Sequence, residues 1–158
     1  MDVRNAEEPE IVHLAQVWYD GWQDAHAGIL PAELRRLRTL ESFTERLRDI
    51  LPNVRVVGSF GAPDGFCIAK GDELYQLYVS AKSRGSGIAA ALVADAETRF
   101  SETGVRTAWL ACAIGNARAA RFYEKCGWRR AGTMTSRLET QGGIFPLEVW
   151  RYEKTIQA

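Results

Sequence analysis

The first fifty residues place apolar side chains at the spacing of amphipathic helices. Between residues 11 and 22 these side chains lie three or four positions apart: Ile11, Leu14, Ala15, Trp18 and Trp22. This period predicts a helix with one buried face, which Gly28 and Pro31 end. A similar period continues from residue 32 to residue 50, so we expect one second helix there, stopped by Pro52.

The middle of the chain changes to short apolar runs separated by turn residues, a pattern typical of strands. Residues 53–60, 66–70 and 73–79 form three such runs. The turns between them contain Pro-Asp-Gly and Gly-Asp, which suit tight reversals, so the three strands should form an antiparallel meander. Residues 105–113 form a further strand. Because a helix beginning near Ile88 precedes it, this strand should lie parallel to residues 73–79.

The last third of the chain predicts a short helix and a closing pair of strands. Asn116 is expected to cap the helix at its start, and Gly127 to end it in a left-handed conformation. Residues 128–138 and 145–155 are expected to pair as antiparallel strands. Neither repeats nor linker-like stretches occur, so we expect residues 1–158 to form a single domain. Its class is α+β: a mixed, mostly antiparallel central sheet with one parallel strand pair and flanking helices.

Charge and cysteine content narrow the classes of partner. The chain carries 20 Lys and Arg against 20 Asp and Glu, which gives no electrostatic basis for binding nucleic acid or a membrane surface. Cys67, Cys112 and Cys126 lack the spacing of a metal site, so we expect free thiols and no metal. The sequence starts with polar and acidic residues and contains no long apolar run, so we expect a cytoplasmic protein.

A basic, glycine-containing turn joins the strand at residues 73–79 to the helix that follows. Lys82 and Arg84 are its cations, and no acidic residue occurs from residue 80 to residue 94. The free N–H groups and the positive dipole end of a helix N-terminus favour a bound anion. The turn therefore predicts a site for a small ligand that carries phosphate.

Three kinds of ligand with phosphate groups could bind at this turn. The sequence does not favour a nucleoside triphosphate, because the pattern GxxxxGK[ST] is absent. A dinucleotide fits the bare pattern at Gly85, Gly87 and Ala90. However, the next strand lacks the acidic residue that would bind a ribose, and a meander precedes the turn where repeated βαβ units are expected. The third ligand is the pyrophosphate of coenzyme A.

Two motifs resemble those of the GNAT superfamily of N-acetyltransferases. The turn Arg84-Gly85-Ser86-Gly87-Ile88-Ala89 is similar to the R/Q-x-x-G-x-G/A signature of that superfamily. Residues 116–128, NARAARFYEKCGW, are similar to its N-x-x-A-x-x-F-Y-x-K-x-G-F segment. The resemblance runs clearly from residue 73 to residue 128. Ala81 stands where the family often has Pro, and Trp128 where it has Phe.

The resemblance implies an N-acetyltransferase that uses acetyl-CoA as co-substrate, with a small-molecule or peptide amine as acceptor. It implies that the sheet splays between its two parallel strands and that backbone groups at Leu77 and Val79 bind the pantetheine. The pyrophosphate would be held by Arg84, Gly85, Ser86, Gly87, Ile88 and Ala89. Members of this family often dimerise, so a homodimer is one expected state.

The helix that begins at Asn116 should contribute a catalytic face. Asn116, Ala119 and Tyr123 are spaced to lie on one side of it, and the small alanine leaves room for a thin chain. Tyr123 matches the family's tyrosine position, which implies a general acid that protonates the coenzyme A sulfur. The alternative is a half-buried tyrosine whose hydroxyl is hydrogen-bonded within the protein.

The general base has more than one candidate. Glu73 lies six residues before Val79, where the histone acetyltransferase branch of the family carries a glutamate. In a regular strand Glu73 shares a face with Tyr75, Leu77 and Val79. Glu73 is equally well explained as an ordinary charge at the start of a strand. Many family members instead deprotonate the amine through water and backbone groups.

The part of the active site that binds the acceptor amine should be formed by the first two helices and the segment that connects them. Trp22 and His26 lie four positions apart near the Gly28 break, and we expect them to line the acceptor pocket. Trp18 shares their side of the helix and is expected in the core. A function of a different class stays open, namely a non-catalytic acyl-CoA-binding or sensor domain on the same fold. Such a domain would not need Tyr123 as an acid.

Overall fold

A seven-stranded sheet forms the centre of the protein in the computed structural model, which describes residues 1–157. The strands are β1 (Arg4–Asn5), β2 (Val54–Val57), β3 (Gly65–Lys70), β4 (Glu73–Val79), β5 (Thr107–Ala113), β6 (Arg129–Thr140) and β7 (Gly143–Thr155). Their order across the sheet is β1-β2-β3-β4-β5-β7-β6. Only the neighbours β4 and β5 are parallel. The predicted α+β class, meander, parallel pair and closing hairpin are all confirmed.

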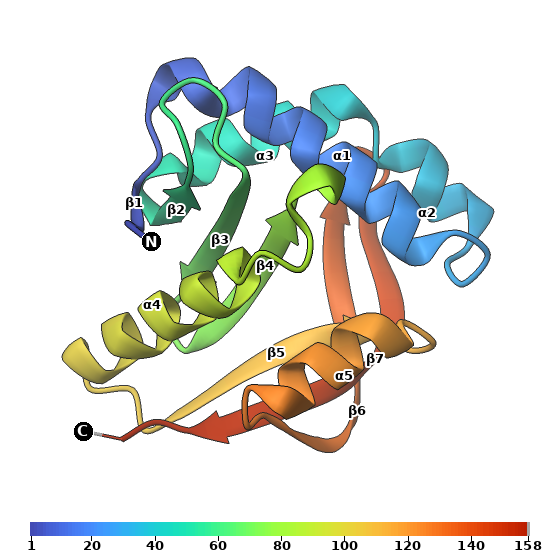
Figure 1. Ribbon diagram of the computed structural model, residues 1–158. Helices are drawn as coiled ribbons and strands as arrows, with labels where there is room; N and C mark the ends of the chain where they lie inside the picture. The colour runs from blue at the N-terminus through green and yellow to red at the C-terminus, as the bar shows by residue number, and fades with distance from the viewer. Residues whose placement is uncertain (158) are drawn as a thin grey trace.

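The helices form two layers on opposite faces of this sheet (Figure 1). They are α1 (Ile11–His26), α2 (Ala32–Leu37), α3 (Leu40–Ile50), α4 (Ile88–Glu102) and α5 (Ala117–Lys125). One core gathers around Trp18 and Phe43 beneath α1 to α3, and a second gathers around Phe100 and Tyr152 beneath α4 and α5. Each layer buries its own apolar face, which is the main favourable contribution to folding.

The expected single helix over residues 32–50 is wrong, because the structure breaks it at Arg38. Arg38 has φ −91° and ψ 70°, outside the helical region. Thr39 then caps α3: its side-chain oxygen accepts a hydrogen bond from the Ser42 N–H at 3.1 Å. A threonine at this position offers the backbone a helix start in place of continuation. The break turns the Arg38 side chain into the protein interior, where it is 4% exposed.

A bulge in β4 changes the faces to which its side chains point. Ile68 of β3 pairs with Gln76, and the adjacent Ala69 pairs with Leu74, so Tyr75 is an extra residue. As a result Tyr75 and Tyr78 both pack toward the α1–α3 layer, whereas Leu77 and Val79 pack toward α4. The expected common face of Glu73, Tyr75, Leu77 and Val79 is therefore wrong.

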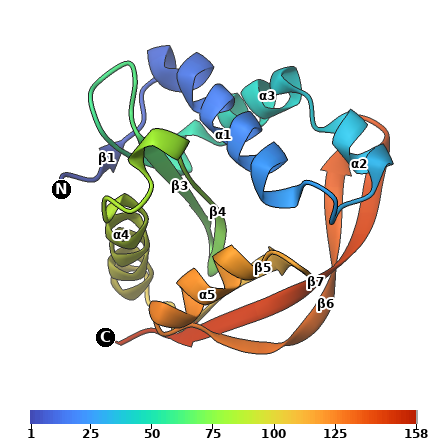
Figure 2. The same cartoon turned by 45° about the vertical axis from the view of Figure 1, so that its right-hand side comes forward.

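The parallel pair separates along its length. Glu73 of β4 is in register with Trp109 of β5, and this is the single matched pair between the two strands. Beyond it β4 continues to Val79 while β5 diverges to pair with β7. Both views show the opening between β4 and β5, with α4 on one side of it and α5 on the other (Figures 1 and 2). The splay expected from the family resemblance is present.

Candidate active site

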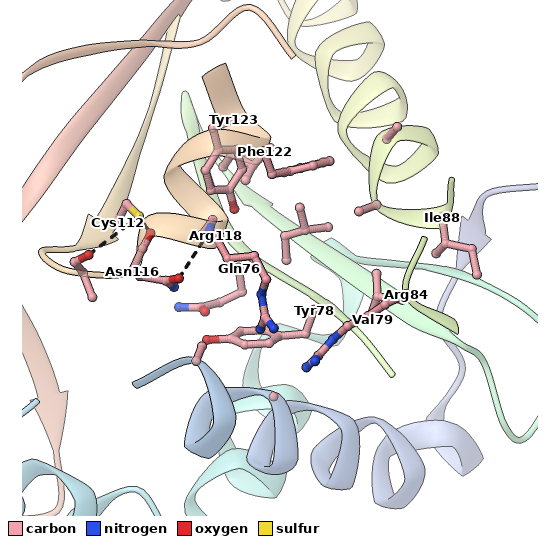
Figure 3. Close-up of a pocket in the computed structure, with 18 of the residues that line it drawn as sticks. Gln76, Tyr78, Val79, Arg84, Ile88, Cys112, Asn116, Arg118, Phe122 and Tyr123 are labelled. Atoms are coloured by element: carbon pink, nitrogen blue, oxygen red, sulfur yellow. Dashed lines mark hydrogen bonds between the residues drawn. The ribbon is translucent and has the colours of Figure 1, made fainter. Parts of the chain in front are cut away.

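The opening between β4 and β5 leads into a cavity of about 400 Å³. Its walls come from β4, the start of α4, the end of β5, one face of α5 and the C-terminal half of α1 (Figure 3). Most residues predicted to bind the coenzyme line it: Leu77, Val79, Arg84, Gly85, Gly87, Ile88, Ala89, Asn116, Ala119 and Tyr123. Ser86 is not among the lining residues, and its hydroxyl donates a hydrogen bond to the Ser83 carbonyl at 2.5 Å.

The glycine turn before α4 has the backbone shape of an anion site. Gly85 has φ +78° and Gly87 has φ +88°, values that favour glycine strongly over residues with a Cβ. α4 starts at Ile88 without a side-chain cap and without an acidic residue in its first turn. The first N–H groups of α4 therefore remain available to a ligand at the positive end of the helix dipole.

Two arginines at the edge of the cavity share one carboxylate. Arg84 and Arg118 donate to Asp24 Oδ2 at 2.8 and 3.3 Å, so α1 is joined to the glycine turn and to α5. Both arginines reach toward α1 (Figure 3). The Arg84 hydrogen bond, then the Arg118 bond, hold the pKa of Asp24 below its ordinary value. Asp24 is half-exposed, so each pair contributes little to stability.

The predicted cap of α5 is confirmed. The Asn116 side-chain oxygen accepts a hydrogen bond from the Ala119 N–H at 3.3 Å, and Gly127 after the helix has φ +90°. This local geometry turns Ala119 and Tyr123 toward the cavity. Alanines on this wall keep the cavity open beside the helix.

Tyr123 is held by aromatic neighbours. Its ring centroid lies 5.4 Å from that of Phe122 and 6.4 Å from those of Trp128 and Tyr152. Over residues 1–157 its hydroxyl has no protein hydrogen-bond partner, although the ring lines the cavity. Burial raises the pKa of Tyr123 well above its ordinary value. The hydroxyl is therefore protonated at neutral pH and can donate.

Glu73 lies at the closed end of the parallel pair. It is half-buried, and it is not among the residues that line the cavity. Burial is the largest effect on its carboxyl and raises its pKa, against the opposing charge of Lys70. The structure therefore does not place Glu73 beside Tyr123 in the cavity wall.

The structure places His26 in the cavity wall and Trp22 behind it. His26 lines the cavity, and its Nδ1 lies 2.9 Å from the Trp22 carbonyl oxygen. Because a carbonyl can only accept, Nδ1 carries the proton and Nε2 keeps its lone pair. Burial lowers the pKa of His26, so the imidazole is neutral at neutral pH. Trp22 is buried against Phe43 and His26 and does not line the cavity.

Four cavity residues of β4 were not predicted as site residues from the sequence: Leu74, Tyr75, Gln76 and Tyr78. Tyr78 reaches the cavity across α1, where a Cβ on Gly21 would lie 2.6 Å from the tyrosine Cδ1. Gly21 therefore makes room for the Tyr78 ring. A glycine in the interior of a predicted helix was the available signal for this close approach.

The splayed parallel pair, the glycine turn and the small-residue face of α5 together define the architecture of a coenzyme A-dependent N-acyltransferase. A sequence model described as the Acetyltransferase (GNAT) family matches residues 18–128. The chain belongs to this family and is an acetyl-CoA-dependent acyltransferase.

Known relatives agree with this assignment. An uncharacterized N-acetyltransferase of Mycobacterium bovis is 34% identical over 119 residues, which cover 71% of this chain and 72% of the relative. A GCN5-related N-acetyltransferase of Rhodopseudomonas palustris has a similar structure, with TM-score 0.76, 20% identity and coverage of 98% and 94% of the two chains. The PaiA N-acetyltransferase of Thermoplasma acidophilum in complex with coenzyme A has TM-score 0.66, 20% identity and 98% coverage of both chains.

Two further observations concern membranes and metals. Among the helices within residues 1–157, none combines the length and apolarity that crossing a membrane requires. In the same part of the chain, His, Cys, Asp and Glu side chains form no group of three or more that could hold a metal ion.

Proposed function

We propose that this chain acts as a single domain that transfers the acetyl group of acetyl-CoA directly to an amine in a ternary complex. The observation that carries the proposal is the junction of the glycine turn with the splayed strand pair. The turn offers N–H groups and Arg84 to a pyrophosphate. Next to it, the unpaired edge of β4 at Leu77 and Val79 offers backbone groups to the pantetheine.

The cavity lining suits a thin, partly apolar chain. Its walls carry Ala111 and Ala113 of β5 and Ala119 of α5, and Asn116 supplies a polar group at one end. Larger side chains at these alanines would fill the space. Acetyl-CoA supplies an activated acetyl group as a thioester, and the protein orients it toward the acceptor.

Tyr123 is the proposed general acid. The amine nitrogen forms a bond to the acetyl carbon, the carbon–sulfur bond breaks, and the Tyr123 hydroxyl gives its proton to the departing thiolate. What supports this role is that the hydroxyl is protonated at neutral pH, lines the cavity and has no hydrogen-bond partner among residues 1–157.

Glu73 is the proposed proton acceptor for the amine, acting through intervening water because it lies outside the cavity wall. Its raised pKa brings the carboxylate closer to the basicity that proton abstraction requires. His26, with Nε2 as an acceptor, and Trp22 behind it are the proposed acceptor-side residues. His26 contacts the acceptor, whereas Trp22 positions the imidazole.

The environment of Cys112 favours direct transfer over transfer through an acetyl-cysteine intermediate. The thiol lines the cavity, but burial raises its pKa to about 11, so it remains protonated at neutral pH and is a poor nucleophile. An acetyl-cysteine intermediate at Cys112 is therefore disfavoured.

Two measurements test this proposal. Titration calorimetry should show binding of acetyl-CoA and no binding of NADH, with affinity weakened by Arg84→Gln. Initial rates with both substrates varied should give the intersecting pattern of a ternary complex. Parallel lines, together with an acetylated protein detected by mass spectrometry, would contradict direct transfer. Binding of NADH in place of acetyl-CoA would support a dinucleotide enzyme instead.

A further inference from the structure

Three uncharged polar side chains line the cavity with hydrogen-bonding atoms that the protein does not use. They are His26 of α1 and Gln76 and Tyr78 of β4. Among residues 1–157, His26 Nε2, the Gln76 side-chain amide and the Tyr78 hydroxyl have no hydrogen-bond partner. His26 is 8% exposed, and the other two residues are half-buried. Polar groups in such positions favour a site where a ligand makes the missing hydrogen bonds.

Gln76 and Tyr78 lie on the face of β4 that looks toward α1. Gln76 pairs with Ile68 of β3, and Ile68 and Tyr78 both pack in the core beneath α1 to α3. Residues that are directly opposite in antiparallel strands share a face of the sheet. Leu77, which is a proposed pantetheine-binding residue, packs instead toward α4. Figure 3 shows the Gln76 and Tyr78 side chains extending from β4 into the cavity.

The three groups offer both donors and acceptors. Because Nδ1 of His26 carries the proton, Nε2 can only accept a hydrogen bond. Burial raises the pKa of Tyr78 well above its ordinary value, so its hydroxyl stays protonated and can donate. The Gln76 amide offers two N–H donors and a carbonyl acceptor. This part of the cavity wall therefore matches a neutral group that both donates and accepts.

The charges around the cavity disfavour an acceptor with a second charged group. In the described part of the chain no Asp or Glu lines the cavity, and the lining arginines are Arg84 and Arg118. Asp24 at the edge already pairs with both of them. A second ammonium group would therefore lose its hydration without a carboxylate partner. A carboxylate would find its cations where the pyrophosphate of the coenzyme is proposed to bind.

We propose that the acceptor is an amine with a neutral amide beside the reacting nitrogen, as in an amino-acid amide or the α-amine of a peptide, and that Gln76 and Tyr78 select it. This inference rests on the proposed acetyl transfer. An amide presents an N–H and a carbonyl in one plane, so the Gln76 amide can pair with it through two hydrogen bonds. The Tyr78 hydroxyl supplies a further donor to the carbonyl.

The cavity allows the amine and the amide of such an acceptor to bind together. In an α-amino amide the amide carbon lies two bonds from the reacting nitrogen, so both groups must enter the same space. Gln76, Tyr78 and His26 line the same cavity as Tyr123, the proposed acid. The acceptor can therefore contact the selecting residues while its nitrogen faces the acetyl group.

The test compares amines that differ in the group beside the reacting nitrogen. Alaninamide is set against ethylamine, leucinamide against isopentylamine, and phenylalaninamide against phenethylamine. Phenylalanine, phenylalaninol and cadaverine test a carboxylate, a hydroxyl and a second ammonium group. Release of coenzyme A thiol from acetyl-CoA gives kcat/KM, expressed per concentration of free amine because a neighbouring amide makes an amine less basic. We expect the best amide to exceed its partner about 10- to 100-fold, the range for hydrogen bonds to otherwise unpaired groups.

Gln76→Met and Tyr78→Phe should each lower this ratio about 10-fold, because each removes hydrogen-bonding atoms and keeps the size of the side chain. The dissociation constant of acetyl-CoA, measured by calorimetry, should change little. The matched controls are Gln16→Met on the exposed face of α1 and Tyr19→Phe, whose ring packs on the same core outside the cavity. Both should keep the wild-type ratio. Without turnover, the best amide should raise the melting temperature of the wild-type complex with coenzyme A and raise that of the two variants less.

Three outcomes would overturn the inference, and each leaves the proposed acetyl transfer intact. The first is a best acceptor without an amide, whether a simple amine, a free acid, an alcohol or a diamine. The second is a preference for amides that neither variant changes. The third is weaker acetyl-CoA binding by both variants with the preference kept, which would assign Gln76 and Tyr78 to the coenzyme. Acetyl-CoA binding without thiol release from any amine would instead remove the proposed acetyl transfer itself.

Discussion

Burial raises the pKa of two side chains that have opposite proposed roles in proton transfer. It raises the pKa of Tyr123, which keeps a proton on the hydroxyl for donation, and it raises the pKa of Glu73, which makes the carboxylate a stronger base. In both residues burial is the largest cause. The protein therefore tunes both groups by location rather than by a charged partner.

Replacing Tyr123 with Phe should lower kcat by about 100-fold or more, because general acid catalysis typically contributes this much. The dissociation constant of acetyl-CoA, measured by calorimetry, should change little. Tyr152→Phe is the matched control, because Tyr152 lies beside Tyr123 but donates to Glu124 at 2.6 Å outside the cavity. It should lower stability and spare turnover. Equal kcat in Tyr123→Phe and wild type would exclude the acid role.

Replacing Glu73 with Gln should lower kcat/KM and remove the rise of the rate with pH on the acid side. Because the folded-state pKa lies above the ordinary value of 4.5, the carboxyl opposes folding once the pH rises above that value. The Gln variant should therefore unfold at the same or higher temperature at pH 7. A pH–rate profile identical to that of the wild type would show that Glu73 is not the base.

At the scale of elements, the glycine turn combines a left-handed backbone conformation with the proposed ligand binding. Gly87→Ala places a Cβ at φ +88°, which should cost about 1–2 kcal/mol of stability and also weaken acetyl-CoA binding. Gly71→Ala is the control, since Gly71 has φ +58° in the β3–β4 turn, outside the cavity. It should destabilise to a similar extent and leave affinity unchanged. Similar acetyl-CoA affinities in both variants would contradict the assignment of this turn.

We expect Asp24, which pairs with Arg84 and Arg118, to compete with the proposed phosphate ligand for these arginines. We expect Asp24→Asn to tighten acetyl-CoA binding about two- to fivefold at low salt, because exposed ion pairs contribute little energy and are screened. Calorimetry at two salt concentrations measures this effect, with the exposed Asp20→Asn on the same helix as control. Weaker binding by Asp24→Asn would mean that Asp24 positions the arginines for the ligand.

Most elements were predictable because their signals are local. The caps at Asn116 and Gly127 and the glycines of the anion turn depend on residues only a few positions apart. The break at Arg38 had one local signal, the capping threonine Thr39, which the helical period of the apolar residues outweighed, and the bulge at Tyr75 had no local signal. Arg38 bonds Glu139, which lies 101 positions away, and the bulge arises from the pairing of β3 with β4. The site residues that depend on these features, such as Tyr78, were missed for the same reason.

At the scale of the whole molecule, the residues of the proposed site lie on opposite faces of the sheet. The α4 and α5 side carries the glycine turn and Tyr123, and the α1–α3 side carries His26. β4 lies between these two sides. Its Tyr75 and Tyr78 pack toward the α1–α3 layer, whereas its Leu77 and Val79 pack toward α4. A donor of the acetyl group and its acceptor can therefore approach β4 from opposite sides.

The most direct test of acetyl transfer is amine-dependent release of coenzyme A thiol from acetyl-CoA. We expect saturable release with at least one amine, equal amounts of thiol and acetylated amine, and a large loss of rate in Tyr123→Phe. Saturable binding of acetyl-CoA without thiol release from any amine would contradict it. That result would identify the protein as a non-catalytic acyl-CoA-binding domain.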